Sequence, residues 1–151
     1  MRTGAILLVG GMGSRLMPLT KATPKPMLSV AGVPFTEHQI RKAADAGISE
    51  IVLATSYKAE LFEPYFGDGS RFGISITYAV EKEPLGTGGA IANAADQLEL
   101  SHNESILIFN GDVLSGHDLK AQIALHQKHN ADVTLYLTRV EDPRAYGCVP
   151  L

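Results

Sequence analysis

A glycine-rich stretch with two fixed cations, residues 10–26, constrains this sequence more than any other part. It follows a short apolar run, residues 5–9, which predicts a buried strand that ends in glycine. Glycines directly after a strand let bare backbone N–H groups approach an anion, because no Cβ stands in the way. Arg15 comes just after the glycines, and Lys25 lies between two prolines that stiffen the backbone around it. The stretch therefore predicts a phosphate-binding loop.

Two well-known phosphate loops do not match this stretch. A Walker A loop needs Gly-Lys-Ser/Thr five residues after its first glycine, and Gly10 is followed at that offset by Arg15. A dinucleotide fingerprint that starts at Gly11 has its second glycine at Gly13, but Leu16 stands where a small residue is needed. Both classes are disfavoured, which leaves a different phosphate loop or an ordinary turn with solvated cations.

The rest of the chain alternates strand and helix patterns. The expected strands cover residues 5–9, 51–54, 74–78, 105–109 and 133–137. The expected helices cover residues 34–46, 58–65, 87–99 and a stretch capped by Asp118 that ends near His129. Strands separated by helices predict an α/β fold, a Rossmann-like three-layer sandwich with a mostly parallel sheet. Ligands of such sheets gather at the carboxyl ends of the strands.

Charge and composition narrow the range of partners. The net charge of −3 argues against nucleic-acid binding, yet residues 1–36 contain four basic residues and no acidic one. Positive charge focused on the glycine stretch fits a polyphosphate ligand, although chance segregation is the simple alternative. No apolar run is long enough to span a membrane and no signal-peptide pattern is present, so a cytoplasmic location is expected. Cys148 has no second cysteine to pair with.

Two later loops carry residues suited to a nucleotide. Glycines in residues 81–89 permit close packing of a flat ring, and Thr87 begins a helix with unpaired N–H groups. Asp112 follows the strand over residues 105–109 directly after a glycine, which is a common way to offer an oxygen ligand to Mg²⁺. The alternatives are an ordinary strand-to-helix connection for the first loop and a turn-capping aspartate for the second.

The pattern Gly-Gly-x-Gly-x-Arg-Leu-x-Pro-Leu-Thr followed by Pro-Lys-Pro resembles the signature of the sugar-1-phosphate nucleotidylyltransferases, also called nucleotide-sugar pyrophosphorylases. Within that family, residues 83–90, 109–112 and 146–150 most resemble the mannose-1-phosphate guanylyltransferases. The resemblance covers residues 4–151 and implies the nucleotide-diphospho-sugar transferase type of the expected fold.

The resemblance implies a nucleotidyltransferase in which a sugar 1-phosphate attacks the α-phosphorus of a nucleoside triphosphate in line and pyrophosphate leaves. GTP and mannose 1-phosphate are the expected substrates, with Mg²⁺ as cofactor. Glucose 1-phosphate with a thymidine or cytidine nucleotide stays open, as does a catalytically inactive relative that senses nucleotide-sugars. No nucleic-acid or membrane partner is expected, and a homo-oligomer is left open.

The resemblance also assigns residues to these roles. Arg15, Lys25 and Asp112 are the expected catalytic residues, with Asp112 as the metal ligand. The expected nucleotide contacts are Leu8, Gly10, Gly11, Met12, Gly13, Ser14, Arg15, Lys25, Glu81, Pro84, Gly86 and Thr87. The expected sugar contacts are Asn110, Gly111, Tyr146 and Gly147. Whether Glu81 or Glu83 faces the base is left open.

The end of the sequence falls within the apolar run of residues 146–151. The resembled family has a second metal-binding aspartate further along its chain. Residues 1–151 are therefore expected to be the nucleotide-binding part of the nucleotidyltransferase domain, truncated before the rest of the sugar-binding part. Whether this part is active alone is left open.

Overall fold

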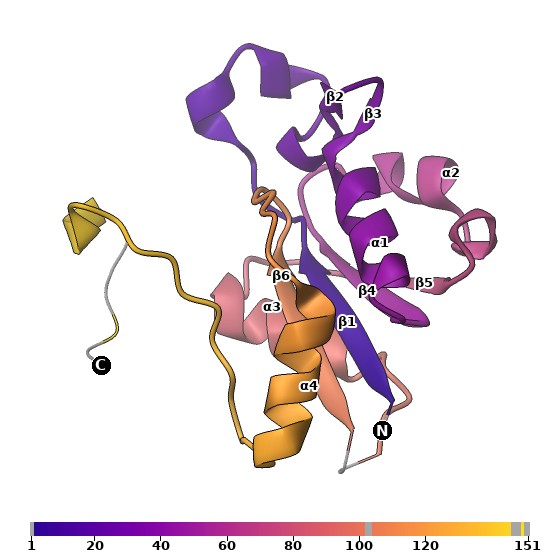
Figure 1. Ribbon diagram of the computed structural model, residues 1–151. Helices are drawn as coiled ribbons and strands as arrows, with labels where there is room; N and C mark the ends of the chain where they lie inside the picture. The colour runs from indigo at the N-terminus through magenta and orange to yellow at the C-terminus, as the bar shows by residue number, and fades with distance from the viewer. Residues whose placement is uncertain (1, 102–103, 146–148, 150–151) are drawn as a thin grey trace. The chain divides into compact units, whose positions relative to one another are not determined.

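A parallel sheet of four strands organises the first of two units in the computed structural model (Figure 1), which describes residues 2–101, 104–145 and 149. The units are Met1–His117 and Asp118–Leu151. The sheet has the order β5-β4-β1-β6 and parallel pairing throughout. Its strands are β1 (Thr3–Leu8), β4 (Glu50–Thr55), β5 (Ser75–Val80) and β6 (Ser105–Asn110). The predicted α/β fold with a mostly parallel sheet is confirmed, and the loops after these strands all leave from one edge.

Two helices pack on opposite faces of this sheet (Figure 1), α1 (Phe35–Asp45) and α3 (Gly86–Ala95). Both were predicted, although α3 ends four residues before the predicted end at Glu99. Pro34 belongs to the short antiparallel pair β2 (Ser29–Val30) and β3 (Val33–Pro34), so α1 begins one residue later than predicted.

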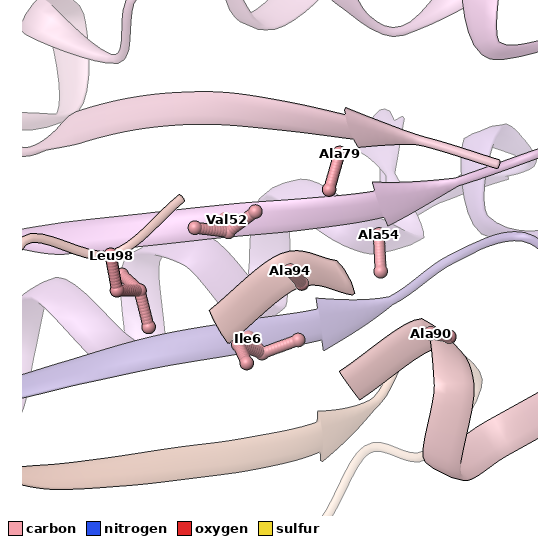
Figure 2. Close-up of a cluster of buried hydrophobic side chains, with 7 residues drawn as sticks. All are labelled: Ile6, Val52, Ala54, Ala79, Ala90, Ala94 and Leu98. Carbon is pink, nitrogen blue, oxygen red and sulfur yellow. The ribbon is translucent and has the colours of Figure 1, made fainter. Parts of the chain in front are cut away.

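The core beneath α3 consists of small and branched apolar side chains (Figure 2). Ile6 pairs with Val52, and Ala54 pairs with Ala79, so their side chains point to the same face. The buried cluster on this face comprises Ile6, Val52, Ala54, Ala79, Ala90, Ala94 and Leu98. Because alanines face one another at this contact, the helix packs close to the strands and holds their carboxyl ends in place.

The predicted helix over residues 58–65 is divided. A 3-10 turn (Ala59–Leu61) precedes the short helix α2 (Glu63–Phe66), which has proline in its first turn. Proline lacks an N–H and cannot continue a helix that has already begun, which explains the break. The other 3-10 turns are Ser14–Leu16, Leu19–Lys21, Lys25–Met27, Ser70–Phe72 and Pro143–Ala145.

The second unit contains α4 (Leu119–His129). Asp118 caps this helix as predicted, since its Oδ1 accepts a 3.0 Å hydrogen bond from the backbone N–H of Ala121. The strand predicted over residues 133–137 is wrong: within the described part of this unit, these residues belong to no strand. Alternating apolar residues cannot form a strand without a partner backbone. Here the carbonyl and hydroxyl of Thr134 meet side chains of α4 instead, those of Gln122 and His126.

Among the residues that the structure describes, no helix combines the length and the apolar composition that a membrane crossing requires.

Candidate active site

A cavity of about 340 Å³ lies at the carboxyl ends of β1 and β6, in the first unit. It is lined by Leu8, Gly11, Gly13, Ser14, Arg15, Leu16, Lys25, Pro26, Asn110, Gly111 and Asp112. The structure thus brings the glycine-rich stretch together with the turn after β6, as the parallel-sheet prediction requires. Leu16 and Pro26 were not among the expected site residues.

Lys25 and Asp112 form an ion pair at this cavity. The Nζ atom of Lys25 donates a 2.9 Å hydrogen bond to Oδ2 of Asp112. Their side chains are 37% and 49% exposed, so solvent and a ligand can reach both. Exposed ion pairs add little to stability, which leaves these two groups free to exchange partners when a ligand arrives.

The glycine loop, which we define as residues 10–24, is held against Lys25 by close contacts. Gly13 has a φ of 60°, and a Cβ on it would lie 2.8 Å from the Cβ of Lys25. The hydroxyl of Thr20 donates a 3.0 Å hydrogen bond to the carbonyl of Gly13. Both the left-handed backbone and the close approach require glycine at position 13. Arg15 follows in a 3-10 turn and lines the cavity, so its guanidinium is available for an anion.

Three consecutive residues after β4 also hold the glycine loop by hydrogen bonds. Ser56 Oγ donates to the carbonyl of Gly10 at 2.6 Å, Tyr57 to that of Thr20 at 3.4 Å, and Lys58 to that of Ala22 at 2.8 Å. We call residues 56–58 the loop brace. The loop brace was not predicted from the sequence, because hydrogen bonds from side chains to distant carbonyls leave no periodic pattern in a sequence.

The turn that carries Asp112 is packed against the end of β1. The N–H of Gly111 donates a 2.9 Å hydrogen bond to the carbonyl of Leu8. A Cβ on Gly111 would lie only 2.4 Å from that carbonyl oxygen. Backbone atoms of a central strand cannot move aside easily, so this position has room for glycine alone. The close approach of two backbones places Asp112 beside the glycine loop.

The other expected site residues lie elsewhere or are not described. Gly10 and Met12 belong to the glycine loop but do not line the cavity. The residues expected from the loop after β5 and from the first turn of α3, which are Glu81, Pro84, Gly86 and Thr87, do not line the cavity either. Glu81 accepts a 3.2 Å hydrogen bond from the N–H of Leu85 within its own loop. Tyr146 and Gly147 lie outside the described residues, as does Cys148.

The site has one carboxylate suited to a metal ion. In the part of the chain that is described, no group of three or more His, Cys, Asp or Glu residues could hold a metal. Magnesium needs no such group, because it takes one or two carboxylates and fills its other positions with water and phosphate oxygens. The half-exposed carboxylate of Asp112 already holds the ammonium of Lys25, a cation, at the cavity wall. The donor set therefore fits Mg²⁺ that arrives with a phosphate ligand.

A second charged cluster surrounds Glu37 on α1, and none of its residues lines the cavity. Glu37 is 3% exposed and accepts hydrogen bonds from Arg41, Tyr65 and Arg71. Burial alone would raise the pKa of Glu37, but the hydrogen bonds from Arg41 and Tyr65 and the charges of both arginines outweigh it and lower that pKa. This cluster joins α1 to α2 and to the turn at residues 70–72, which is a structural role.

Comparison with known proteins identifies the family of this chain. The family model described as nucleotidyl transferase matches residues 4–151. The chain belongs to the nucleotidyl transferase family. A mannose-1-phosphate guanylyltransferase from Mycobacterium tuberculosis is 55% identical over 146 residues, which are 97% of this chain and 40% of that protein. The chain thus spans about two fifths of the length of the curated relatives it matches.

Solved structures show the same fold. A Bacillus anthracis protein provisionally named glucose-1-phosphate thymidylyltransferase, in complex with sucrose, has a TM-score of 0.76 and 28% identity. The match covers 83% of this chain and 50% of that one. The protein HddC from Yersinia pseudotuberculosis, complexed with GMP-PN, has a TM-score of 0.71 and 33% identity. That match covers 83% of this chain and 54% of HddC.

Proposed function

We propose that this chain forms the nucleotide-binding part of an enzyme that transfers a guanylyl group from GTP to mannose 1-phosphate. A phosphate oxygen of the sugar phosphate attacks the α-phosphorus of GTP, and a new P–O bond forms. The bond from the α-phosphorus to the bridging oxygen breaks, and pyrophosphate leaves with the electron pair. The products are GDP-mannose and pyrophosphate. Residues 1–151 would supply the triphosphate site, with the rest of the sugar site provided by further chain.

One observation carries the proposal: Arg15, Lys25 and Asp112 line one cavity beside the bare N–H groups of the glycine loop. Both reactants are polyanions, so they repel each other until positive charge surrounds them. Phosphoryl-transfer sites work mainly by positioning and charge stabilisation, which needs no covalent intermediate. We assign Arg15 and the N–H groups of Gly11, Gly13 and Ser14 to the triphosphate.

Lys25 is suited to the reacting phosphates. Its ammonium can leave Asp112 and bind phosphate oxygens, because the ion pair is open to solvent. Asp112 would then hold Mg²⁺, which supplies charge neutralisation to the phosphate oxygens when bound. The single carboxylate and its place on the cavity wall support this assignment.

Two likenesses favour guanine and mannose. The 55% identical relative is named a mannose-1-phosphate guanylyltransferase, and HddC, at 33% identity, was solved with the guanine nucleotide analogue GMP-PN. Glu81, Pro84, Gly86 and Thr87 remain our candidates for contacts to the base. Asn110 and Gly111 line the cavity and remain candidates for the sugar side, together with Tyr146 and Gly147.

A substrate panel tests the proposal. Four nucleoside triphosphates are each combined with mannose 1-phosphate and glucose 1-phosphate, and pyrophosphate release by the full-length protein is measured with and without Mg²⁺. We expect the highest kcat/KM for GTP with mannose 1-phosphate, and a strict requirement for metal. GTP binding without turnover on any sugar phosphate would instead indicate a sensor of nucleotide-sugars. Preference for another base or sugar would overturn the substrate assignment and leave the reaction class intact.

A further inference from the structure

A buried glutamine on α1 holds the turn that carries Asp112. Gln39 is 2% exposed, and its Nε2 amide donates hydrogen bonds to the carbonyls of Asn110, at 3.4 Å, and Val113. These two carbonyls lie on either side of Asp112 in the sequence. One amide group from α1 therefore closes the turn around the carboxylate.

Because the side chain of Gln39 is buried, its amide needs these hydrogen bonds. A buried amide that loses its partners keeps the full cost of leaving water, so the side chain of Gln39 depends on the two carbonyls of the turn. A single NH₂ group has two N–H donors, which is enough for one hydrogen bond to each carbonyl.

The next residue on the same face of α1 extends the contact. Lys42, three positions after Gln39, donates from Nζ to the carbonyl of Ser115 at 2.6 Å. Residues three apart on a helix are neighbours on its surface. Helix α1 thus holds the segment 110–115 at two successive points, and the one nearer Asp112 is the buried amide of Gln39.

Gln39 does not line the cavity, so it would act on a ligand there through the turn that carries Asp112. Asp112, by contrast, is half exposed and bonded to Lys25, a contact that would be exchanged when a triphosphate binds. From that moment the backbone of the turn determines where the carboxylate lies. Some residues do not touch a metal ion but orient one of its ligands. Loss of such a residue commonly weakens metal binding about 10- to 100-fold.

We propose that Gln39 is a positioning residue that sets the carboxylate of Asp112 for a divalent cation bound with the nucleotide. This inference rests on the proposed function, since it assigns the cation to Asp112. The residue lies on helix α1 and does not line the cavity. It acts through its hydrogen bonds to the carbonyls of Asn110 and Val113.

The test measures how much Mg²⁺ strengthens GTP binding. Calorimetry gives the Kd of GTP with EDTA and with saturating Mg²⁺ for the full-length protein, and the ratio of the two is the metal increment. Gln39→Met keeps the length of the side chain and removes both donors. Gln39→Glu keeps the shape and places a carboxylate oxygen against two carbonyl oxygens. The exposed Gln97, changed to Glu, is the matched control.

We expect the metal increment to fall about tenfold in Gln39→Met and further in Gln39→Glu. The Kd measured with EDTA should change less than twofold, and Gln97→Glu should match the wild type. An unchanged increment in Gln39→Met would overturn the proposal, and an equal loss with and without metal would show a merely structural role. Thermal unfolding of each variant shows whether it is folded.

Asp112→Asn separates this inference from the proposed function. Loss of the metal increment in Asp112→Asn, with a normal increment in Gln39→Met, means that the carboxylate binds the cation without help from Gln39. A normal increment in Asp112→Asn means that the cation binds elsewhere, which overturns the assignment of Asp112 and with it the role of Gln39.

Discussion

Lys25 Nζ donates a 2.9 Å hydrogen bond to Asp112 Oδ2, although the two residues are 87 positions apart. They meet because β1 and β6 are neighbours in a parallel sheet and their carboxyl ends lie at one edge. A cation from the glycine-rich stretch and an anion from the turn after β6 thus share one cavity. The pair joins the two groups that we assign to the phosphates and to the metal.

Replacement of either partner should reduce turnover. Lys25→Ala removes a cation from the reacting phosphates and Asp112→Asn removes the metal ligand, so each should lower kcat about 10²- to 10³-fold. Steady-state pyrophosphate release checks this. Lys21→Ala, which removes an exposed lysine from the same stretch, should keep near-normal kcat. Near-normal turnover of Lys25→Ala or Asp112→Asn would contradict the assignment of that residue.

Gly111→Ala should disturb the turn by steric conflict. The new Cβ would lie 2.4 Å from the carbonyl oxygen of Leu8, so β1 and the turn must separate. We expect a loss of about 1–3 kcal/mol in the free energy of unfolding, measured with urea, and a weaker metal increment. Gly116→Ala is the matched control, since nothing lies within 4 Å of its Cβ position. Equal stability of the two variants would contradict the packing argument.

The loop brace should matter for nucleotide affinity. Ser56→Ala removes the hydroxyl that donates to Gly10 at 2.6 Å, and one such bond contributes about 1 kcal/mol. We expect the KM for GTP to rise about three- to tenfold with a smaller change in kcat, because the loop becomes less well ordered before GTP binds. The exposed Ser75, changed to Ala, should leave KM unchanged. A wild-type KM in Ser56→Ala would show that the loop does not need this bond.

Glu37 should make stability depend on pH. Its folded-state pKa lies below the ordinary value of 4.5, so the stabilisation is complete above pH 4.5 and is lost as the pH falls through the lowered pKa. Glu37→Gln should therefore be less stable than the wild type at pH 7, by about 2 kcal/mol.

Urea unfolding between pH 7 and pH 3 measures that difference. It should shrink as the solution is acidified below about pH 4.5, because the wild type then loses the charge of Glu37. Glu60→Gln, at an exposed position, should show a small difference at every pH. A difference between Glu37→Gln and the wild type that stays constant with pH would contradict the role of this ionised carboxylate.

Sequence patterns predicted the sheet well because local periodicity carries that information. The apolar runs before the glycine loop and before Asp112 are confirmed as β1 and β6. The spacing of glycines, Arg15 and Lys25 predicted a phosphate loop, and Gly11, Gly13, Arg15 and Lys25 do line one cavity. The same reasoning failed for residues 133–137, because alternation shows which side chains are apolar and not whether a partner strand exists.

By itself, the sequence determined the four strands of the parallel sheet, the helices α1, α3 and α4, the glycine positions that a tight loop requires, and the family. Those features depend on neighbours within a few residues, so a linear pattern records them. Tertiary structure alone decided that Gln39 closes the turn around Asp112, that Ser56 to Lys58 hold the glycine loop, and that Lys25 meets Asp112. Those contacts join segments dozens of residues apart, and their distances depend on how the helices pack on the sheet.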